Sequence, residues 1–137
     1  YWNRPEETAA ALGGGWLRTG DVATVDDEGY ITIVDRKKDI IVSGGENVSS
    51  VEVEVCLADH PAVSEAAVVG MPDAKWGEVP HAFVTLRPGA PAVDETELIA
   101  WVRDRLAHFK APGRVDVVDE LPKGGTGKIQ KEELRRR

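Results

Sequence analysis

Cysteine and long apolar runs are almost absent from this sequence. Cys56 is the only cysteine among the 137 residues, so no disulfide can form within the chain. No run approaches the roughly 18–20 consecutive apolar residues that a membrane-spanning helix requires, and no signal-peptide pattern is present. We therefore expect a cytoplasmic protein without a transmembrane segment.

The sequence also lacks the excess of basic residues that is typical of nucleic-acid-binding proteins. Its 17 Lys and Arg residues are outnumbered by 24 Asp and Glu residues, and the formal net charge is −7. Because a surface that binds phosphate backbones needs positive charge, this balance argues against nucleic acid as a partner. The chain has no cluster of histidine and cysteine either, so we expect no metal site built from its own residues.

The chain is short and begins without methionine. Its length fits one ordinary domain with a short attached segment, and a hydrophobic fraction of 42% is enough for a core. Tyr1 and Trp2 would be costly to leave exposed at a free terminus, since aromatic side chains bring large apolar areas. We therefore expect a piece of a longer protein, in which other residues pack against these aromatics.

Apolar periodicity and turn residues predict an irregular alternation of helices and strands. Pro5 followed by two glutamates indicates the start of a helix, and three glycines at 13–15 indicate its end. The predicted strands are a hairpin over 22–34 and single strands over 40–42, 63–69, 79–86 and 114–118, with a turn at 71–73. The other predicted helices begin at 130 and cover 94–109, where one apolar stripe contains Leu98, Val102, Leu106 and Phe109.

Residues 51–57 carry two conflicting patterns. Val and Glu alternate with a period of two, which favours a strand. Ser49 followed by Glu52 forms a capping box and Pro61 provides a stop, which together favour a helix. We assign these residues to a helix.

A run of five charged residues at 35–39 interrupts the apolar pattern and marks the expected boundary between two structural units. From residue 40 onward, the mixture of strands and helices predicts an α+β fold, in which helices flank a small mixed sheet. We therefore divide the chain into residues 1–37 and residues 38–137.

The histidines and the basic C-terminal residues carry no pattern typical of catalysis. His60 precedes a proline at a helix end and is interpreted as a cap or surface residue. His81 lies in a predicted strand, and His108 lies at the end of the long helix, where a cation suits the helix dipole. The three arginines at 135–137 are interpreted as a solvated helix end.

Three segments place charged residues beside glycines, and the first two surround Asp21 and Gly44. Asp21 follows Gly20 and could accept hydrogen bonds from a vicinal diol such as ribose, although the segment read alone is more typical of a simple turn. Gly44 and Gly45 allow a second chain or a narrow ligand to lie against the backbone without a Cβ clash. Read alone, this pair is also typical of a hairpin tip.

The third segment, residues 121–129, is similar to a phosphate-binding loop but departs from the P-loop pattern at two positions. Pro122 stands where the first glycine is required, and Ile129 replaces the hydroxyl that binds Mg²⁺. Lys128 on a flexible glycine-rich loop suits transient contact with a phosphate or a carboxylate. Read alone, it is also typical of a solvated loop residue.

Taken in order along the chain, these segments closely resemble the adenylate-forming superfamily, which contains acyl-CoA synthetases, luciferases and peptide-synthetase adenylation domains. Residues 1–8 and 17–21 resemble the region that ends in the family's nucleotide-binding aspartate. Residues 35–39 resemble its hinge motif, and residues 122–128 resemble its catalytic-lysine motif. The resemblance covers essentially the whole chain and implies the C-terminal portion of such an enzyme.

The resemblance implies a fold and an organisation. Residues 38–137 would be the mobile C-terminal cap domain, and residues 1–37 would be the end of the large N-terminal domain, which is the expected partner. The implied substrates are a carboxylic acid, ATP with Mg²⁺ ligated outside these residues, and coenzyme A. A carboxylate would attack ATP to give an acyl-adenylate, and the thiol of coenzyme A would then displace AMP.

The resemblance also implies roles for particular residues. Asp21 would bind the ribose hydroxyls, Arg36 would contact the nucleotide, and Lys38 would be the hinge. Lys128 would stabilise charge on the carboxylate and the α-phosphate during adenylation. After rotation of the cap domain, the loop formed by Ser43, Gly44 and Gly45 would line the channel for pantetheine.

The sequence leaves several kinds of enzyme within the superfamily as candidates, and it favours acyl-CoA synthetases. Residues 43–54 and 75–84 look most like the branch that activates short- and medium-chain acids, so a fatty or related carboxylic acid is expected. Luciferases carry a lysine in place of Val42 and are disfavoured. A peptide-synthetase-type adenylation domain is an alternative. A non-catalytic interaction module is another, because residues 1–137 lack the family's ATP loop and acyl pocket; the isolated chain is expected to be inactive.

Overall fold

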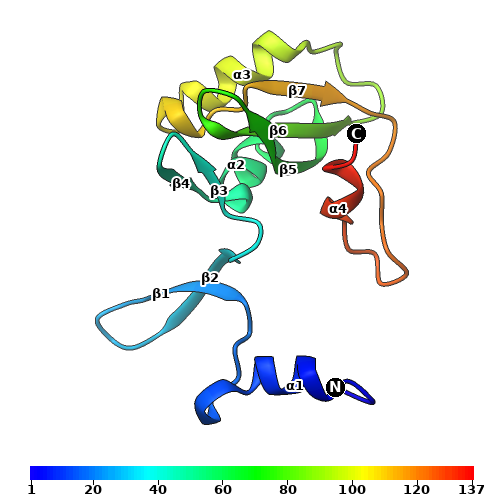
Figure 1. Cartoon of the computed structure of the whole chain (residues 1–137). Coiled ribbons are helices and arrows are strands. Elements are labelled where there is room, and N and C mark those ends of the chain that lie inside the picture. The colour runs from blue at the N-terminus through cyan, green and yellow to red at the C-terminus, as the bar shows by residue number, and fades with distance from the viewer. The chain divides into compact units, whose positions relative to one another are not determined.

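The computed structural model describes all 137 residues, which form two compact units, Tyr1–Lys38 and Asp39–Arg137. Figure 1 labels their helices and strands. The division falls inside the charged run at 35–39, where residues 37–39 form a turn between two strands.

The first unit consists of one helix and one hairpin. Helix α1 (Pro5–Ala11) is followed by a short 3₁₀ helix at Gly13–Gly15, and strands β1 (Asp21–Val25) and β2 (Ile31–Arg36) pair antiparallel. The hairpin turn forms because Oδ1 of Asp26 accepts hydrogen bonds from the backbone N–H groups of Glu28 and Tyr30, at 3.0 and 2.9 Å. The predicted helix and hairpin are both confirmed. No apolar side chain of this unit is buried.

The second unit is built around a mixed sheet of five strands. They are β3 (Ile41–Ser43), β4 (Glu46–Val48), β5 (Val63–Asp73), β6 (Gly77–Leu86) and β7 (Arg114–Val117). The antiparallel strands follow the order β4-β3-β6-β5, and β7 pairs with β6 in parallel. Strand β3 joins β6 only where Ser43 lies opposite Gly77, so the β3–β4 hairpin is attached to one end of the sheet.

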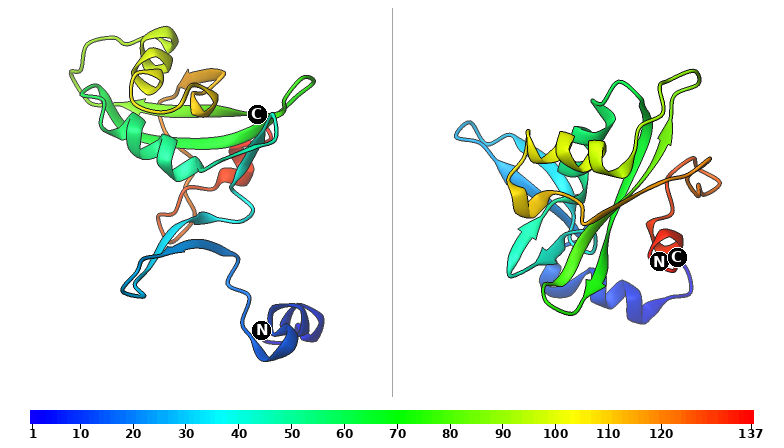
Figure 2. Two further views of the ribbon diagram at one scale, coloured as in Figure 1. Left: turned by 90° about the vertical axis from the view of Figure 1, so that its left-hand side faces the viewer. Right: turned by 90° about the horizontal axis from the view of Figure 1, so that it is seen from above.

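Two cores lie on the two faces of this sheet, because successive side chains of a strand point to opposite sides. On one face, α2 (Ser50–Ala58) and α3 (Glu95–Arg103) cover Val68, Ala82 and Val84. On the other face, Ala67, Val69 and Phe83 form a cluster with Leu121 and with Leu134 of α4 (Lys131–Leu134). The right-hand view of Figure 2 shows α2 and α3 on one side of the strands and α4 on the other. The predicted α+β fold, a small mixed sheet flanked by helices, is confirmed.

Helix α2 resolves the conflict between the two patterns in residues 51–57. Oγ of Ser49 accepts a hydrogen bond from the backbone N–H of Glu52 at 3.3 Å, which caps the helix as the capping box predicts. Val53 and Leu57 are fully buried at a spacing of four residues, while Val51 and Val55 are exposed. Helical periodicity therefore decides which valines reach the core, and the predicted helix is confirmed.

Two predicted boundaries are wrong, and one strand was not predicted. Strand β5 continues through residues 71–73, and the turn lies at 74–76, where Oδ1 of Asp73 accepts from the N–H groups of Lys75 and Trp76 at 2.8 Å. Helix α3 ends at Arg103 rather than at residue 109, and Ala107, four residues further on, has an extended ψ of 140°. Strand β4 was not predicted, since Glu46 and Asn47, two of its three residues, are of types that are depleted in strands.

Because α3 ends early, two side chains lie elsewhere than predicted. Phe109 lies in a 3₁₀ turn at His108–Lys110 and is exposed, so it does not continue the apolar stripe of Leu98 and Val102. His108 lies in the same turn, so it does not cap the long helix.

His60 is buried, contrary to its interpretation as a cap or surface residue. Its Nδ1 accepts a hydrogen bond from the N–H of Ala62 at 3.2 Å, and its ring packs edge-on against Trp101. His60 therefore belongs to the packing of α3 against the turn that follows α2.

Candidate functional site

Asp21 and Arg36 lie directly opposite each other in the β1–β2 hairpin. Their Cα atoms are partners in the strand register, and Nε of Arg36 lies 3.4 Å from Oδ1 of Asp21. Thr19 Oγ1 accepts a hydrogen bond from the N–H of Asp21 at 3.1 Å, and Gly20 O accepts one from the N–H of Lys37 at 2.8 Å. The hairpin end therefore presents a carboxylate and a guanidinium side by side, a pair that can bind a diol and an anion.

Lys38 is the last residue of the first unit and is exposed in the turn that follows β2. Asp39, the next residue, is the first of the second unit, and its exposed fraction is only 8%. Lys38 is therefore exposed to solvent, whereas the adjacent Asp39 is buried.

Gly44 and Gly45 form the two-residue turn between β3 and β4. Their φ angles are +60° and +88°, which glycine adopts without the steric cost that other residues meet. Gly44 also lies tightly against Trp76: its N–H donates to the carbonyl of Trp76 at 2.8 Å, and a Cβ added to Gly44 would lie 2.8 Å from Cε3 of that ring. Ser43, at the end of β3, is partly buried.

A pocket of about 380 Å³ opens beside this turn. Ser43 and Gly44 line it together with the aromatic rings of Trp76 and Phe109 and the basic side chains of Arg103 and His108. The carboxylate of Glu46 lies in the same lining. The combination of glycine backbone, aromatic surface and polar groups suits a narrow organic chain.

Lys128 lies on a glycine-rich loop that is closed at its base by backbone hydrogen bonds. Residues 123 and 129 form an antiparallel bridge, the N–H of Gly124 donates to the carbonyl of Lys128, and the N–H of Gln130 donates to the carbonyl of Pro122, both at 2.8 Å. The side chain of Lys128 is exposed and makes no hydrogen bond or ion pair. The closed loop thus exposes an ammonium group that has no interaction partner within the chain.

The structure groups the candidate residues by unit. Asp21 and Arg36 lie together in residues 1–38, whereas Ser43 to Gly45 and Lys128 belong to residues 39–137. Within the second unit, the β3–β4 turn and the loop before α4 lie at separate places (Figures 1 and 2). The glycine turn and the lysine loop therefore lie apart in the second unit.

Other ionisable groups, among them Cys56 and His81, are held in contacts within the fold. Burial raises the pKa of the Cys56 thiol, an effect that the charge of Arg105 only partly opposes, so this thiol is a poor nucleophile at neutral pH. His81 stacks on Phe83 and lies 2.9 Å from Asp116. No group of three or more His, Cys, Asp or Glu side chains could hold a metal ion, and none of the helices is both long and apolar enough to cross a membrane.

Sequence reasoning missed the residues that hold α4 in place. Arg135 is not solvated as interpreted, because its Nη2 lies 2.7 Å from Oδ1 of Asp39. Lys131 similarly pairs with Glu54 at 2.7 Å. The available signal was the spacing of Lys131 and Arg135 by four residues, which places both on one side of a helix.

Comparison with known proteins identifies the family. Residues 52–128 match the model of the AMP-binding enzyme C-terminal domain. Feruloyl-CoA synthase of Amycolatopsis sp. is 53% identical over 137 residues, and 2-succinylbenzoate–CoA ligase of Geobacillus kaustophilus is 49% identical over 136 residues. These matches cover 100% and 99% of this chain, which spans 28% of the length of either relative.

A solved structure gives the same result. The chain superposes on o-succinylbenzoate CoA synthetase (MenE) from Bacillus subtilis, in complex with the acyl-adenylate intermediate OSB-AMP, with a TM-score of 0.90 and 42% identity. The match covers 98% of this chain and 27% of that one. The resemblance drawn from the sequence motifs is thereby confirmed: this chain belongs to the family of AMP-binding enzyme C-terminal domains.

Proposed function

We propose that this chain is the C-terminal part of an ATP-dependent acyl-CoA synthetase. The enzyme activates a fatty or related carboxylic acid as an acyl-adenylate and transfers the acyl group to coenzyme A. The observation that carries the proposal is the exposed, unpaired ammonium group of Lys128 on a closed glycine-rich loop. Two relatives that share about half of their aligned residues with this chain are named for joining an acid to CoA.

In the first step, a carboxylate oxygen of the acid attacks the α-phosphorus of ATP, and pyrophosphate leaves. We assign to Lys128 the stabilisation of negative charge on the carboxylate and the α-phosphate. A single charge placed at such a transition state is worth about 3–4 kcal/mol. Asp21 would hold the ribose hydroxyls, and Arg36, paired with it at 3.4 Å, would contact the nucleotide. Mg²⁺ would accompany ATP and be ligated by residues outside this chain.

In the second step, the thiol sulfur of coenzyme A attacks the acyl carbon, and AMP leaves. We assign to Ser43, Gly44 and Gly45 the wall of the pantetheine channel. The positive φ angles of both glycines and the absence of Cβ atoms support this role, as does the adjoining pocket with its aromatic and polar lining. The separation of this turn from the Lys128 loop supports a rotation about Lys38 between the two steps.

The proposal also includes the partner domain of this chain and its cellular compartment. A large N-terminal domain would be the partner of residues 38–137, and residues 1–37 would be its last part. Exposed aromatic and aliphatic side chains throughout the first unit, with Trp2 at 92% and Trp16 at 81% exposure, support contact with further protein. We place the enzyme in the cytoplasm, where ATP and coenzyme A are both available.

The relatives do not define one acid. Ferulate and 2-succinylbenzoate differ in size and charge, yet the enzymes named for them share 53% and 49% of their aligned residues with this chain. We infer that selection of the acid depends on residues outside this region.

ATP–pyrophosphate exchange by the full-length enzyme tests the proposal. We expect a panel of aliphatic and aryl carboxylic acids to contain at least one that supports exchange, and that acid to yield an acyl-CoA when coenzyme A is added. Omission of the acid is the control. If no acid on a broad panel supports exchange, the protein is not an adenylate-forming enzyme; if exchange occurs without any CoA ester, coenzyme A is not the acceptor.

A further inference from the structure

Helix α4 connects the loop of Lys128 to the start of the second unit. It begins at Lys131, three residues after Lys128, and has only four residues. A helix this short has almost no stability of its own, so tertiary contacts must hold it. One contact is apolar: Leu134 is fully buried in the cluster with Phe83 and Leu121.

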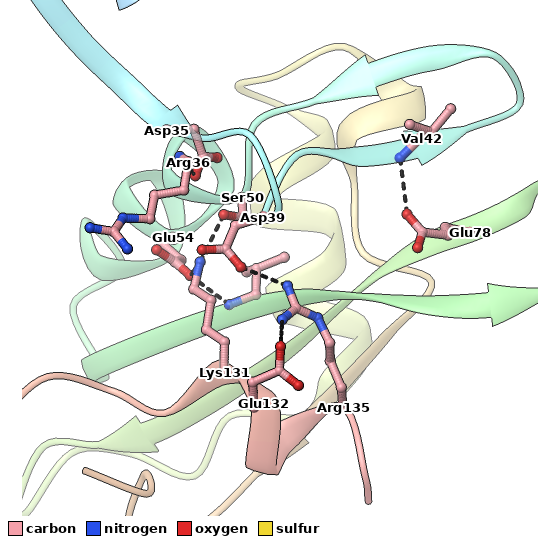
Figure 3. A network of polar contacts seen from close by, with 11 residues as sticks. Asp35, Arg36, Asp39, Val42, Ser50, Glu54, Glu78, Lys131, Glu132 and Arg135 are labelled. Carbon is pink, nitrogen blue, oxygen red and sulfur yellow. Dashed lines mark hydrogen bonds and ion pairs between the residues drawn. The ribbon is translucent and has the colours of Figure 1, made fainter. Parts of the chain in front are cut away.

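Two charged side chains supply the other contacts of α4. Nη2 of Arg135 lies 2.7 Å from Oδ1 of Asp39, and Nζ of Lys131 lies 2.7 Å from both Oε1 of Glu54 and Oγ of Ser50. Figure 3 shows both basic side chains reaching from α4 to these partners. Lys131, Arg135, Asp39, Glu54 and Ser50 are called the α4 clamp below.

Burial makes the loss of one member of the clamp more costly than the loss of one member of a surface ion pair. Asp39 is 8% exposed, and the side chains of Lys131 and Glu54 are 17% and 19% exposed. Removing one member of a buried pair leaves the other charge without its partner, which costs far more than losing an exposed pair. Glu54 is further fixed by the N–H of Val68 in β5, which donates to its Oε1 at 2.8 Å.

We propose that Arg135 and Lys131 are positioning residues for Lys128. They bind the base of the lysine loop to Asp39, the first residue after the proposed hinge, and to α2. The direction of the Lys128 ammonium group is then determined by the segment about which the cap domain turns. Arg135 would act through the position of Lys128 and not on the substrate itself. The catalytic consequence rests on the proposed function, whereas the clamp rests on the distances above.

The loop geometry explains why the clamp matters. Gln130, which precedes α4, donates to the carbonyl of Pro122, so any shift of α4 also moves the base of the loop. A misplacement of about 1 Å in a catalytic group lowers a rate by as much as about 100-fold. A loosened α4 should therefore affect adenylation, in which Lys128 acts, more than thioester formation.

Hydrogen exchange in the full-length enzyme tests the clamp without reference to activity. In the Arg135→Met variant, we expect the peptide that covers residues 122–130 to exchange about tenfold faster, while peptides of α3 stay unchanged. Arg136→Met is the matched control, since Arg136 is exposed on the same helix end and makes no ion pair. Equal exchange in the Arg135 and Arg136 variants would overturn the proposal.

The two half-reactions test the catalytic consequence. We expect Arg135→Met to lower kcat/KM for adenylation by about 10- to 100-fold, and to leave thioester formation from preformed acyl-adenylate within about twofold. Arg135→Lys should recover most of the loss. Asp39→Asn should resemble Arg135→Met, and the double variant should be no worse than either single variant, because both remove the pair between Arg135 and Asp39. The other ion pair of Arg135, with Glu132 at 3.3 Å, is exposed and contributes little.

The outcomes separate the clamp from the proposed function. Equal losses in both half-reactions, without rescue by lysine, would show that Arg135 only stabilises the fold and would overturn the positioning role. If the exchange results hold but the unmodified enzyme forms no adenylate, the proposed function fails, and the attachment of the loop to Asp39 stands.

Discussion

At the scale of single residues, Asp116 shows how a carboxylate of β7 is held between two basic groups. Oδ1 accepts a hydrogen bond from Nε of Arg114 at 3.0 Å, and Oδ2 lies 2.9 Å from Nε2 of His81. Burial acts to raise the pKa of Asp116, but the hydrogen bonds from Arg114 and His81 outweigh it and lower this pKa below its usual value.

The lowered pKa of Asp116 predicts a particular pH dependence. The folded protein holds the ionised carboxylate more tightly than the unfolded chain, whose aspartates titrate near pH ~3.9. The stabilisation is therefore present above about pH 4 and is lost as the pH falls through the folded pKa. We expect Asp116→Asn to lower the free energy of unfolding by about 1 kcal/mol at pH 7 and by much less near pH 3.

Urea unfolding at the two pH values measures this difference. Asp119→Asn is the control, because Asp119 lies three residues further along and makes no ion pair. A loss of stability that is the same at pH 7 and pH 3 would contradict the assigned cause.

The candidate residues differ in how far the sequence reveals them. Asp21, Gly44 and Lys128 stand in glycine-rich segments with a recognisable order, so the sequence alone is enough to propose them. The spacing of Lys131 and Arg135 indicates only that both lie on one side of a helix. The pairing of Arg135 with Asp39 joins residues 96 positions apart, and no local pattern indicates this partner. Arg135 was consequently interpreted as solvated.

At the scale of helices and strands, local signals predicted α2 but not the end of α3. The hydrogen bond from Glu52 N–H to Ser49 is a short-range event, so the sequence pattern and the structure agree. The stripe from Leu98 to Phe109 has helical spacing throughout, yet α3 ends at Arg103 and Ala107 has an extended ψ of 140°. Lys110, in the 3₁₀ turn that follows, pairs with Glu52 of α2 at 2.7 Å, so a long-range contact overrides the helical pattern there.

The β3–β4 turn offers a test of why glycine occupies its first position. Any side chain at Gly44 or Gly45 meets the cost of positive φ, about 1–2 kcal/mol. A Cβ at Gly44 would in addition meet the Trp76 ring at 2.8 Å, whereas a Cβ at Gly45 would meet nothing within 4 Å. We expect Gly44→Ala to lower the free energy of unfolding more than Gly45→Ala does.

Thermal or urea unfolding of both variants measures the difference in their free energies of unfolding. Trp76→Ala, combined with Gly44→Ala, should remove this difference. In the full-length enzyme, Gly44→Ala should also lower thioester formation more than adenylate formation, relative to Gly45→Ala. Equal stabilities of the two single variants would show that Trp76 adapts and that φ alone selects glycine at this turn.

At the scale of the whole molecule, the chain joins two units of different character. Residues 39–137 bury two apolar clusters on the two faces of one sheet, whereas residues 1–38 bury no apolar side chain. The α+β class of the second unit could be predicted because its periodic segments are distinct. The order of its strands could not, since β7 pairs with β6 across a helix and a 3₁₀ turn.

The proposed mechanism assigns one step to each of two surfaces of the second unit. The lysine loop would act in adenylation, and the glycine turn would act in thioester formation. Lys128 is exposed and unpaired, so its replacement should leave the fold intact and remove only its charge.

Separate measurement of both half-reactions in the full-length Lys128→Ala variant tests this assignment. We expect adenylate formation to fall by about 10²–10³, which corresponds to the loss of one transition-state contact, while thioester formation from preformed acyl-adenylate proceeds at nearly its normal rate. The free energy of unfolding of the variant is the control, and we expect it to be unchanged. A variant that forms adenylate at the normal rate would contradict the catalytic role of Lys128 and, with it, the proposed division of the two steps between two surfaces.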